Sequence, residues 1–296
     1  MALYPTDAAC AAMLEKRRWP NGFQCPACHF GHGWKLDTKP WTWECQHCGH
    51  QTSVTAGTIL HGSKIPLRKW FLAAHFLATH SNGMSALQLQ VKLGLGSYKS
   101  AWLLLQKLRL AMLNPARTLL AGDVEVDETT IPFRTRNEPV DGGQGRSQIG
   151  KITVVGAVEL KGERAGRIRL EVAPNYQGET LKGFIKNNIG IGSHIWTDGN
   201  SSYCGLKDYV HTARVIGATP AHLIMPWIHR VFSNLKSWGN GVFHGFRERY
   251  LPLYLNEFVF RWNRRLSYLS AFDRLIGFGV AHLPAPYKLI RSTCSI

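Results

Sequence analysis

Apolar residues recur along the chain with two different periods, and the change of period divides the sequence. Between residues 67 and 108 they recur three or four residues apart, as on one face of a helix, and Gly83 and Gly94 interrupt them. From residue 123 they alternate with polar residues or form short continuous runs, as in β-strands. Helical spacing returns at about residue 225. The pattern predicts a helical block, then a sheet, then closing helices.

Within the helical block, Ser85 and Ser97 each precede a segment with helical spacing, and a serine in that position can cap a helix. A short helix, a glycine turn and a longer helix form the pattern of a helix-turn-helix. We expect the longer helix to offer four residues to DNA: Ser97, Tyr98, Lys99 and Lys107. The structural alternative is a three-helix linker bundle without a DNA-binding role.

The sheet region contains five predicted strands and three predicted helices. The strands are expected at residues 123–131, 152–160, 167–172, up to 198 and 209–216, and the helices at 178–188, from 225 and at 251–265. A three-strand meander, a helix, two further strands and a helix is the element order of the RNase H-like fold. The predicted class is therefore α/β, with a mixed five-stranded sheet. The basic, glycine-rich residues 142–147 indicate a long loop that either grips phosphates or is simply solvated.

Two Cys-x-x-Cys pairs stand before the helical block. The four cysteines are Cys25, Cys28, Cys45 and Cys48. This spacing is typical of a tetrahedral structural zinc site, and the spacer between the pairs suits a small β-hairpin, which together predict a zinc ribbon. Four thiolate ligands leave no open position on the metal, so such a zinc ion is structural. A redox pair and plain core cysteines are the alternatives.

Composition and charge indicate the partner. The chain has 296 residues, 45% of them hydrophobic, and a formal net charge of +16. That excess favours a polyanionic partner, most simply nucleic acid, over a generally basic protein. We find neither a signal-peptide pattern in the first residues nor an apolar run long enough to span a bilayer, so we expect an intracellular protein without a membrane role.

Acidic residues gather on the first predicted strand. Asp127 lies there beside Glu125 and Glu128, and burying carboxylates so close together is costly without cations. Asp198 ends a second short apolar strand. If the fold places these strands side by side, Asp127 and Asp198 can share a divalent metal ion, magnesium or manganese.

At this point the sequence resembles the transposases of bacterial insertion sequences that join a zinc ribbon to a DDE-type, RNase H-like core. The resemblance rests on segments in the same order along nearly the whole chain: the ribbon with residues 54–58, then 85–89, 124–129, 156–159, 197–199, 229–236, 244–245 and 254–265. It implies that Asp127 and Asp198 are the first two catalytic carboxylates. It also implies three segments: ribbon and first helix at 1–60, helix-turn-helix at 61–116 and catalytic domain with closing helices at 117–296.

The third catalytic position departs from the family pattern. Relatives often carry a Glu seven residues before a Lys, whereas this chain has His229 seven residues before Lys236. Seven residues are two helical turns, so both lie on one helix face. Asn234 competes for the role, because some relatives are described by an Asp-Asp-Asn pattern, and Glu257 is a more distant candidate. We expect His229 or Asn234 to complete the site and Lys236 to pair with a phosphate near the cut.

The resemblance implies a mechanism and partners. Two divalent ions, held by Asp127, Asp198 and His229, would support attack of water and then of a 3′-hydroxyl on DNA phosphates. The partners would be double-stranded DNA of the transposon ends and the target, bound by a dimer or larger assembly in the bacterial cytoplasm, at the nucleoid. Two other functions stay open: a DNA-binding regulator that has lost catalysis, and an RNase H-like nuclease.

Overall fold

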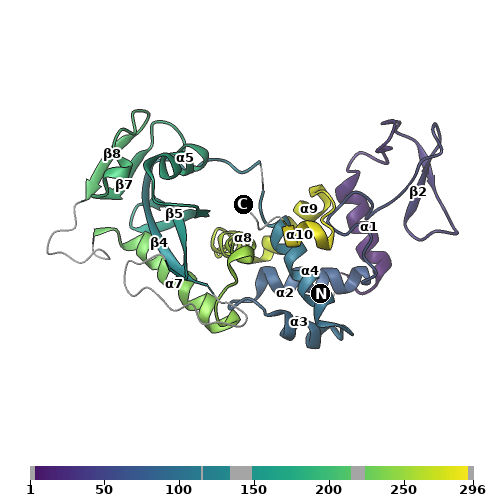
Figure 1. Ribbon diagram of the computed structural model, residues 1–296. Helices are drawn as coiled ribbons and strands as arrows, with labels where there is room; N and C mark the ends of the chain where they lie inside the picture. Colours follow the sequence, from purple (N-terminus) through teal and green to yellow (C-terminus); the bar gives the residue numbers. More distant parts are fainter. Residues whose placement is uncertain (1–3, 115, 134–148, 215–223, 293–296) are drawn as a thin grey trace. The chain divides into compact units, whose positions relative to one another are not determined.

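Two compact units make up the chain. The computed structural model describes residues 4–114, 116–133, 149–214 and 224–292 (Figure 1). One unit comprises Met1–Asn114 with Ser267–Thr293, and the other comprises Pro115–Leu266 with Cys294–Ile296. The assignment of the closing helices to the catalytic segment, expected at residues 117–296, therefore differs from the observed packing. The closing helix α9 (Tyr268–Ala281) packs against helices α1, α2 and α4 and belongs with the N-terminal segment, not with the sheet.

The ribbon follows helix α1 (Asp7–Arg18), which begins where the Thr6 hydroxyl accepts a hydrogen bond from Ala9 N–H at 3.2 Å. Strands β1 (Gly33–Lys35) and β2 (Thr42–Cys45) form the predicted hairpin between the cysteine pairs, and β3 (Gln51–Ser53) extends it to three antiparallel strands.

Three helices then form the predicted helix-turn-helix block: α2 (Leu67–Thr79), α3 (Ala86–Leu93) and α4 (Tyr98–Ala111). Ser85 caps α3 and forms a reciprocal capping box with Gln88, and Ser97 caps α4. Gly94 makes the turn with φ of 56°, a conformation that favours glycine. The apolar inner face of α4 is buried as expected, and α9 and α10 (Tyr287–Ser292) pack on the same unit.

The second unit is built on the predicted five-stranded mixed sheet. Its strands are β4 (Asp123–Pro132), β5 (Lys151–Lys161), β6 (Arg164–Ala173), β7 (His194–Asp198) and β8 (Val210–Arg214). They lie in the order β6-β5-β4-β7-β8; β4–β6 pair antiparallel, whereas β7 and β8 pair parallel. The RNase H-like arrangement is thereby confirmed. The predicted loop at 142–147 and the end of the fifth strand at 215–216 lie outside the described residues.

Helices cover both faces of this sheet (Figure 1). One face packs against α5 (Gly178–Asn188), and the other against α7 (Pro226–Phe243) and α8 (Leu251–Trp262), which ends three residues earlier than expected. The close approach of α7 depends on Gly156, the β5 residue paired with Asp127. A Cβ atom there would lie 2.8 Å from the Phe232 ring of α7, so no larger residue fits without displacing that helix.

Candidate active site

Strand pairing brings the two aspartates to the same level of the sheet. β4 and β7 run parallel with Asp123 opposite His194 and Glu125 opposite Trp196. The pairing ends at Glu125 and Trp196, and the same register extended by two residues along each strand brings Asp127 level with Asp198. Side chains alternate along a strand, so both aspartates share the sheet face of Glu125, toward α7.

Asp127 lies in a crowded, nearly dry position. The residue is 7% exposed. Its Oδ1 accepts the Glu128 N–H at 2.8 Å, and its Oδ2 lies 3.7 Å from His229 Nε2. Burial, then the charges of Glu128 and Asp198, raise the pKa of Asp127 to about 8, against the opposing Glu128 N–H. A carboxylate held like this gains most from a bound divalent cation, which suits the predicted magnesium or manganese.

Glu125 has a different task from Asp127. It is 1% exposed, and its Oε2 accepts hydrogen bonds from two backbone N–H groups at the start of α7, Trp227 at 3.0 Å and Ile228 at 2.8 Å. Burial raises the pKa of Glu125, and these two N–H groups oppose that rise. The sheet thereby supplies the cap that the first turn of α7 requires.

Glu128 contacts the loop that follows Asp198. Its Oε1 accepts from the Asn200 side-chain amide at 3.0 Å, and its Oε2 accepts from the Tyr203 hydroxyl. Tyr203 is fully buried, in the short 3-10 helix η1 (Ser201–Tyr203). The backbone N–H of Asn200 in turn donates to Asp198 Oδ1 at 3.0 Å. A continuous set of hydrogen bonds thus links the strand of Asp127 to Asp198.

Helix α7 presents His229 and Lys236 to Asp127. Both are half-buried, and burial, then the charge of Lys151, lowers the pKa of Lys236, against the charge of Asp127. Asn234 is exposed and lies roughly 140° around the helix from His229. Glu257 is fully buried in α8, 3.6 Å from Arg261 Nη1. The structure brings Asp127, His229 and Lys236 together, and it places Asn234 and Glu257 elsewhere.

Among the described residues, one group of cysteine, histidine or acidic side chains gathers its ligand atoms tightly enough for a ready-made metal site. It consists of Cys25, Cys28, Cys45 and Cys48, with all sulfur atoms within 4.8 Å of one another. The Sγ atoms of Cys25 and Cys48 are 3.7 Å apart, and those of Cys28 and Cys45 are 3.6 Å apart. Tetrahedral zinc with bonds of about 2.3 Å requires sulfur separations of about 3.8 Å, so the group fits zinc.

The proposed DNA-contacting residues divide into two sets. Ser97, Tyr98 and Lys99 are exposed at the start of α4. Lys107 is 8% exposed, and its Nζ donates to the carbonyl of Ile59 at 3.3 Å. The expectation that Lys107 contacts DNA is therefore wrong for this structure: helical spacing turns it toward the interior, where burial lowers its pKa.

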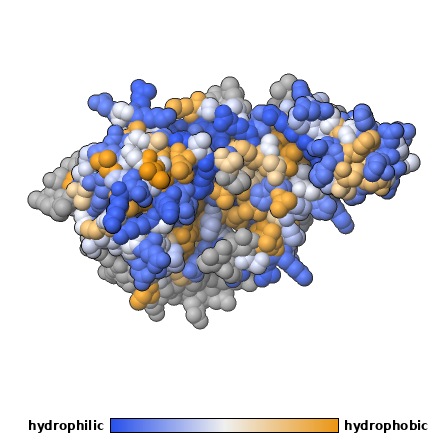
Figure 2. All heavy atoms as spheres, turned by 90° about the horizontal axis from the view of Figure 1, so that it is seen from above, coloured by the Kyte–Doolittle hydropathy of each residue, from blue (hydrophilic) through white to orange (hydrophobic). Residues whose placement is uncertain are grey.

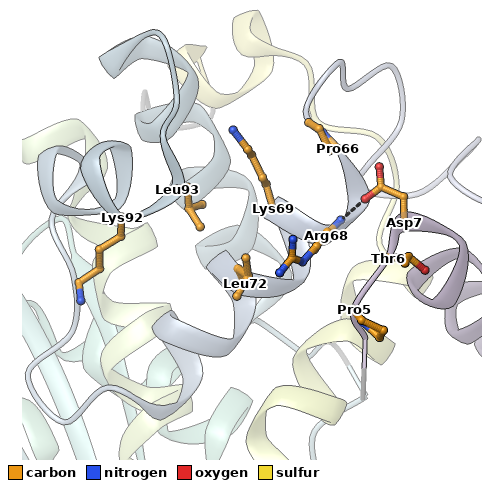
Figure 3. A pocket seen from close by; sticks show the side chains of 9 residues that line it. All are labelled: Pro5, Thr6, Asp7, Pro66, Arg68, Lys69, Leu72, Lys92 and Leu93. Carbon is orange, nitrogen blue, oxygen red and sulfur yellow. Dashed lines mark hydrogen bonds between the residues drawn. The ribbon is translucent and has the colours of Figure 1, made fainter. Parts of the chain in front are cut away.

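A basic hollow of about 540 Å³ lies in the same unit, between the starts of α1 and α2 and the end of α3. Figure 3 shows the side chains of Arg68, Lys69 and Lys92 around it. The one acidic group in its lining, Asp7, accepts the backbone N–H of Arg68 at 2.7 Å, and Lys69 Nζ donates to the Gly94 carbonyl at 3.0 Å. Positive side chains outnumber negative ones, so the hollow suits an anionic group.

Hydrophilic side chains cover much of the surface seen in Figure 2, with hydrophobic side chains exposed in smaller patches. Some of the exposed apolar residues lie on the helix-turn-helix, including Leu87, Val91 and Tyr98. No helix within the described ranges has the length and apolar character needed to cross a membrane.

Sequence reasoning missed the roles of Asn200 and Tyr203, and it treated Glu125 and Glu128 only as neighbours of Asp127. The sole signal for Asn200 was its place just after an Asp-Gly turn. The contacts of these four residues join segments 72 to 103 positions apart, which no local pattern encodes.

Comparisons with known proteins match two parts of the chain. The model of the ISXO2-like transposase domain matches residues 119–263, and that of the transposase zinc-ribbon domain matches residues 5–51. An uncharacterized protein in transposable element ISH50 of Halobacterium salinarum is 28% identical over 146 residues, 46% of this chain and 47% of that protein. The chain thus matches about half the length of this curated relative.

A solved structure gives a weaker likeness. It is a cryo-EM structure of the simian T-cell lymphotropic virus intasome in complex with PP2A regulatory subunit B56 gamma. The match has 13% sequence identity and a TM-score of 0.31, and it covers 63% of this chain and 68% of that chain.

Proposed function

We propose that the chain, which matches the models of a transposase zinc-ribbon domain and an ISXO2-like transposase domain, is an insertion-sequence transposase that binds the terminal inverted repeats of its element and cuts and joins DNA strands there. The observation that carries the proposal is the level placement of Asp127 and Asp198 on adjacent parallel strands, with His229 Nε2 at 3.7 Å from Asp127.

Asp127, Asp198 and His229 would hold two divalent ions. When bound, such ions activate the attacking water or 3′-hydroxyl and stabilise the leaving oxygen of the scissile phosphate. Asp127 supplies the carboxylate that burial and neighbouring charges leave most in need of a cation. Lys236, on the same face of α7 as His229, would pair with a phosphate oxygen near the cut. Asn234 is the alternative third ligand. In that case α7 must rotate about its axis when DNA binds, so that Asn234 faces Asp127.

The N-terminal unit would bind DNA. Support comes from the net charge of +16, the exposed start of α4 at Ser97, Tyr98 and Lys99, and the basic hollow at α2. Phosphate contacts of this kind make binding salt-dependent, because each releases condensed counterions. We further propose that a dimer or larger assembly holds two transposon ends. A complex with one chain per pair of ends, measured by light scattering, contradicts that part of the proposal.

A DNA-binding regulator without catalysis is the second candidate. It is favoured by one observation: a histidine stands where relatives often carry the third carboxylate. Both the transposase and the regulator would bind end DNA, so binding does not distinguish them and the test must measure cutting. An RNase H-like nuclease would cut without requiring an inverted repeat.

The test is nicking of a labelled duplex that carries the element's end, with magnesium and with manganese, beside a scrambled-end duplex. The wild type is compared with Asp127→Ala, Asp198→Ala, His229→Ala and Asn234→Ala. We expect end-dependent nicking that both aspartate variants and His229→Ala abolish and that Asn234→Ala retains. Tight binding without nicking in either metal establishes the regulator, and equal nicking of the scrambled duplex establishes the nuclease.

A further inference from the structure

We infer that the two glutamates flanking Asp127 are positioning residues and not metal ligands. Glu128 holds the loop of Asp198 and Glu125 holds the helix of His229, so each fixes one partner of Asp127. The inference rests on the proposed function and deepens it, since it assigns separate tasks to three carboxylates within four residues of one strand.

The first step concerns the oxygens of Glu128. Oε1 accepts from Asn200 Nδ2 at 3.0 Å and Oε2 accepts from the hydroxyl of Tyr203. Tyr203 is 0% exposed, so its hydroxyl has no water to turn to when this bond is lost. A carboxylate with a protein donor on each oxygen is oriented by the loop, and it orients the loop in return.

The second step leads from Asn200 to Asp198. The backbone N–H of Asn200 donates to Asp198 Oδ1 at 3.0 Å, and Asn200 Oδ1 accepts the backbone N–H of Ser202 at 3.0 Å. Ser202 Oγ donates to the carbonyl of Tyr176, also at 3.0 Å. The side-chain amide of Asn200 therefore has a fixed orientation, with its oxygen toward Ser202 and its nitrogen toward Glu128.

The third step shows why β7 needs this contact. The recorded pairing between β4 and β7 ends at Glu125 opposite Trp196, two residues before Asp127 and Asp198. Beyond that point β7 pairs with β8 alone, up to Asp198 opposite Arg214. The separation of the two aspartates is thus no longer fixed by backbone hydrogen bonds between their strands, and the Glu128–Asn200 contact spans the gap.

Glu125 acts in the same way on the other side. The residue before α7, Met225, provides no side-chain cap, and Glu125 Oε2 accepts the N–H groups of Trp227 and Ile228 instead. His229 is the next residue, within the first turn of the helix. A buried carboxylate at a helix start also interacts favourably with the helix dipole, so Glu125 anchors that turn to the strand of Asp127.

The deciding experiment exchanges the two groups that meet between Glu128 and Asn200. In Glu128→Gln one of the two contacts is lost in either orientation of the new amide. If its oxygen accepts from Tyr203, its nitrogen faces the nitrogen of Asn200, which Ser202 keeps from flipping. If its oxygen accepts from Asn200, the buried hydroxyl proton of Tyr203 loses its acceptor. In the double variant Glu128→Gln, Asn200→Asp the contact is restored with donor and acceptor reversed, and the summed charge equals that of the wild type. Glu163→Gln, at an exposed glutamate of the β5–β6 turn, is the matched control.

Three quantities are measured: the Mn²⁺ concentration for half-maximal nicking, the rise in melting temperature on adding Mn²⁺, and metal-free affinity for end DNA. We expect Glu128→Gln and Asn200→Asp each to raise the Mn²⁺ concentration for half-maximal nicking about 10-fold or more, as loss of a ligand-orienting contact does. DNA affinity should stay within about 2-fold, and the double variant should recover most of the loss, because the contact is restored. Glu125→Gln, which keeps an acceptor for α7, should retain Mn²⁺ binding, whereas Glu125→Leu should lose it.

The outcomes separate the inference from the proposed function. Unchanged Mn²⁺ dependence in both single variants, or a double variant worse than either, overturns the positioning role. Loss of Mn²⁺ binding in Glu125→Gln equal to that in Glu125→Leu makes Glu125 a ligand. A wild type that binds Mn²⁺ but does not nick end DNA contradicts the proposed function, while the shift in melting temperature still decides the positioning. If Glu128→Gln fails to fold, Tyr203→Phe is used in its place, because it removes the hydroxyl that donates to Glu128.

Discussion

The metal-free sheet unit should become less stable as the pH rises from 5 to 7, and Asp127 is the main cause. Its pKa is about 8 in the folded chain, against an ordinary value of 3.8. The folded state therefore keeps a proton that the unfolded chain releases. The resulting penalty is absent below pH 3.8, grows as the pH rises above it and levels off above pH 8.

The size of this effect follows from the two pKa values. Each pH unit between them changes the free energy of unfolding by about 1.4 kcal/mol, so the penalty is about 1.6 kcal/mol at pH 5 and about 4 kcal/mol at pH 7. The expected loss between pH 5 and pH 7 is thus on the order of 3 kcal/mol. Glu125 and Glu128, whose pKa values are also raised by burial, act in the same direction.

Native-state hydrogen exchange of the β4 and β5 amides measures this change, with zinc present and no magnesium or manganese. Amides of α4, in the other unit, serve as the internal reference. The Asp127→Asn variant cannot ionise at this position and should lose most of the pH dependence. Manganese should reverse the trend in the wild type, because it binds the ionised carboxylate and stabilises the folded state by mass action. Equal slopes in the wild type and Asp127→Asn would refute the reasoning.

Three further predictions concern other parts of the chain. Gly156→Ala should destabilise the sheet unit by about 1–3 kcal/mol in urea unfolding, since its Cβ would lie 2.8 Å from Phe232, and stability equal to the wild type would contradict that packing. Cys45→Ser, or mild zinc chelation, should abolish exchange protection in roughly residues 20–55 and spare the sheet; a protected ribbon in the zinc-free protein would exclude the four-cysteine site. Lys92→Gln should reduce the slope of log affinity for end DNA against log salt concentration by about 0.9, because one phosphate contact is lost. The comparison variant Lys288→Gln, at an exposed lysine outside the hollow, should change this slope only if DNA reaches α10.

Much of the architecture was predictable from the sequence because its signals are local. The cysteine spacing indicated the ribbon, the serines at 85 and 97 marked helix starts, and the change from helical spacing to alternation located the sheet. The strand order followed from the element order. An error occurred where no local pattern decides the packing: α9 packs on a segment more than 150 residues away.

Lys107 illustrates a second limit. A lysine on a predicted DNA-binding helix favours phosphate contact, yet only the direction of its side chain decides whether it reaches solvent. Three residues of α4 close to it, Leu104, Leu105 and Leu108, are buried, and Lys107 is turned toward Ile59 and Trp70 instead of solvent. The apolar pattern alone did not show how wide the buried stripe of this helix is, and that width determined the outcome.

The acidic strand shows most clearly where sequence reasoning ends. Composition indicates that carboxylates gathered on a buried strand need compensation, and a metal ion is one way to provide it. Compensation is in fact divided: Glu125 receives two backbone N–H groups, Glu128 receives an amide and a hydroxyl, and Asp127 receives one backbone N–H with a histidine nitrogen at 3.7 Å. Asp127 is thus the carboxylate with the least compensation from the protein itself. A cation is therefore expected at Asp127, and the glutamates beside it keep the remaining ligands in place.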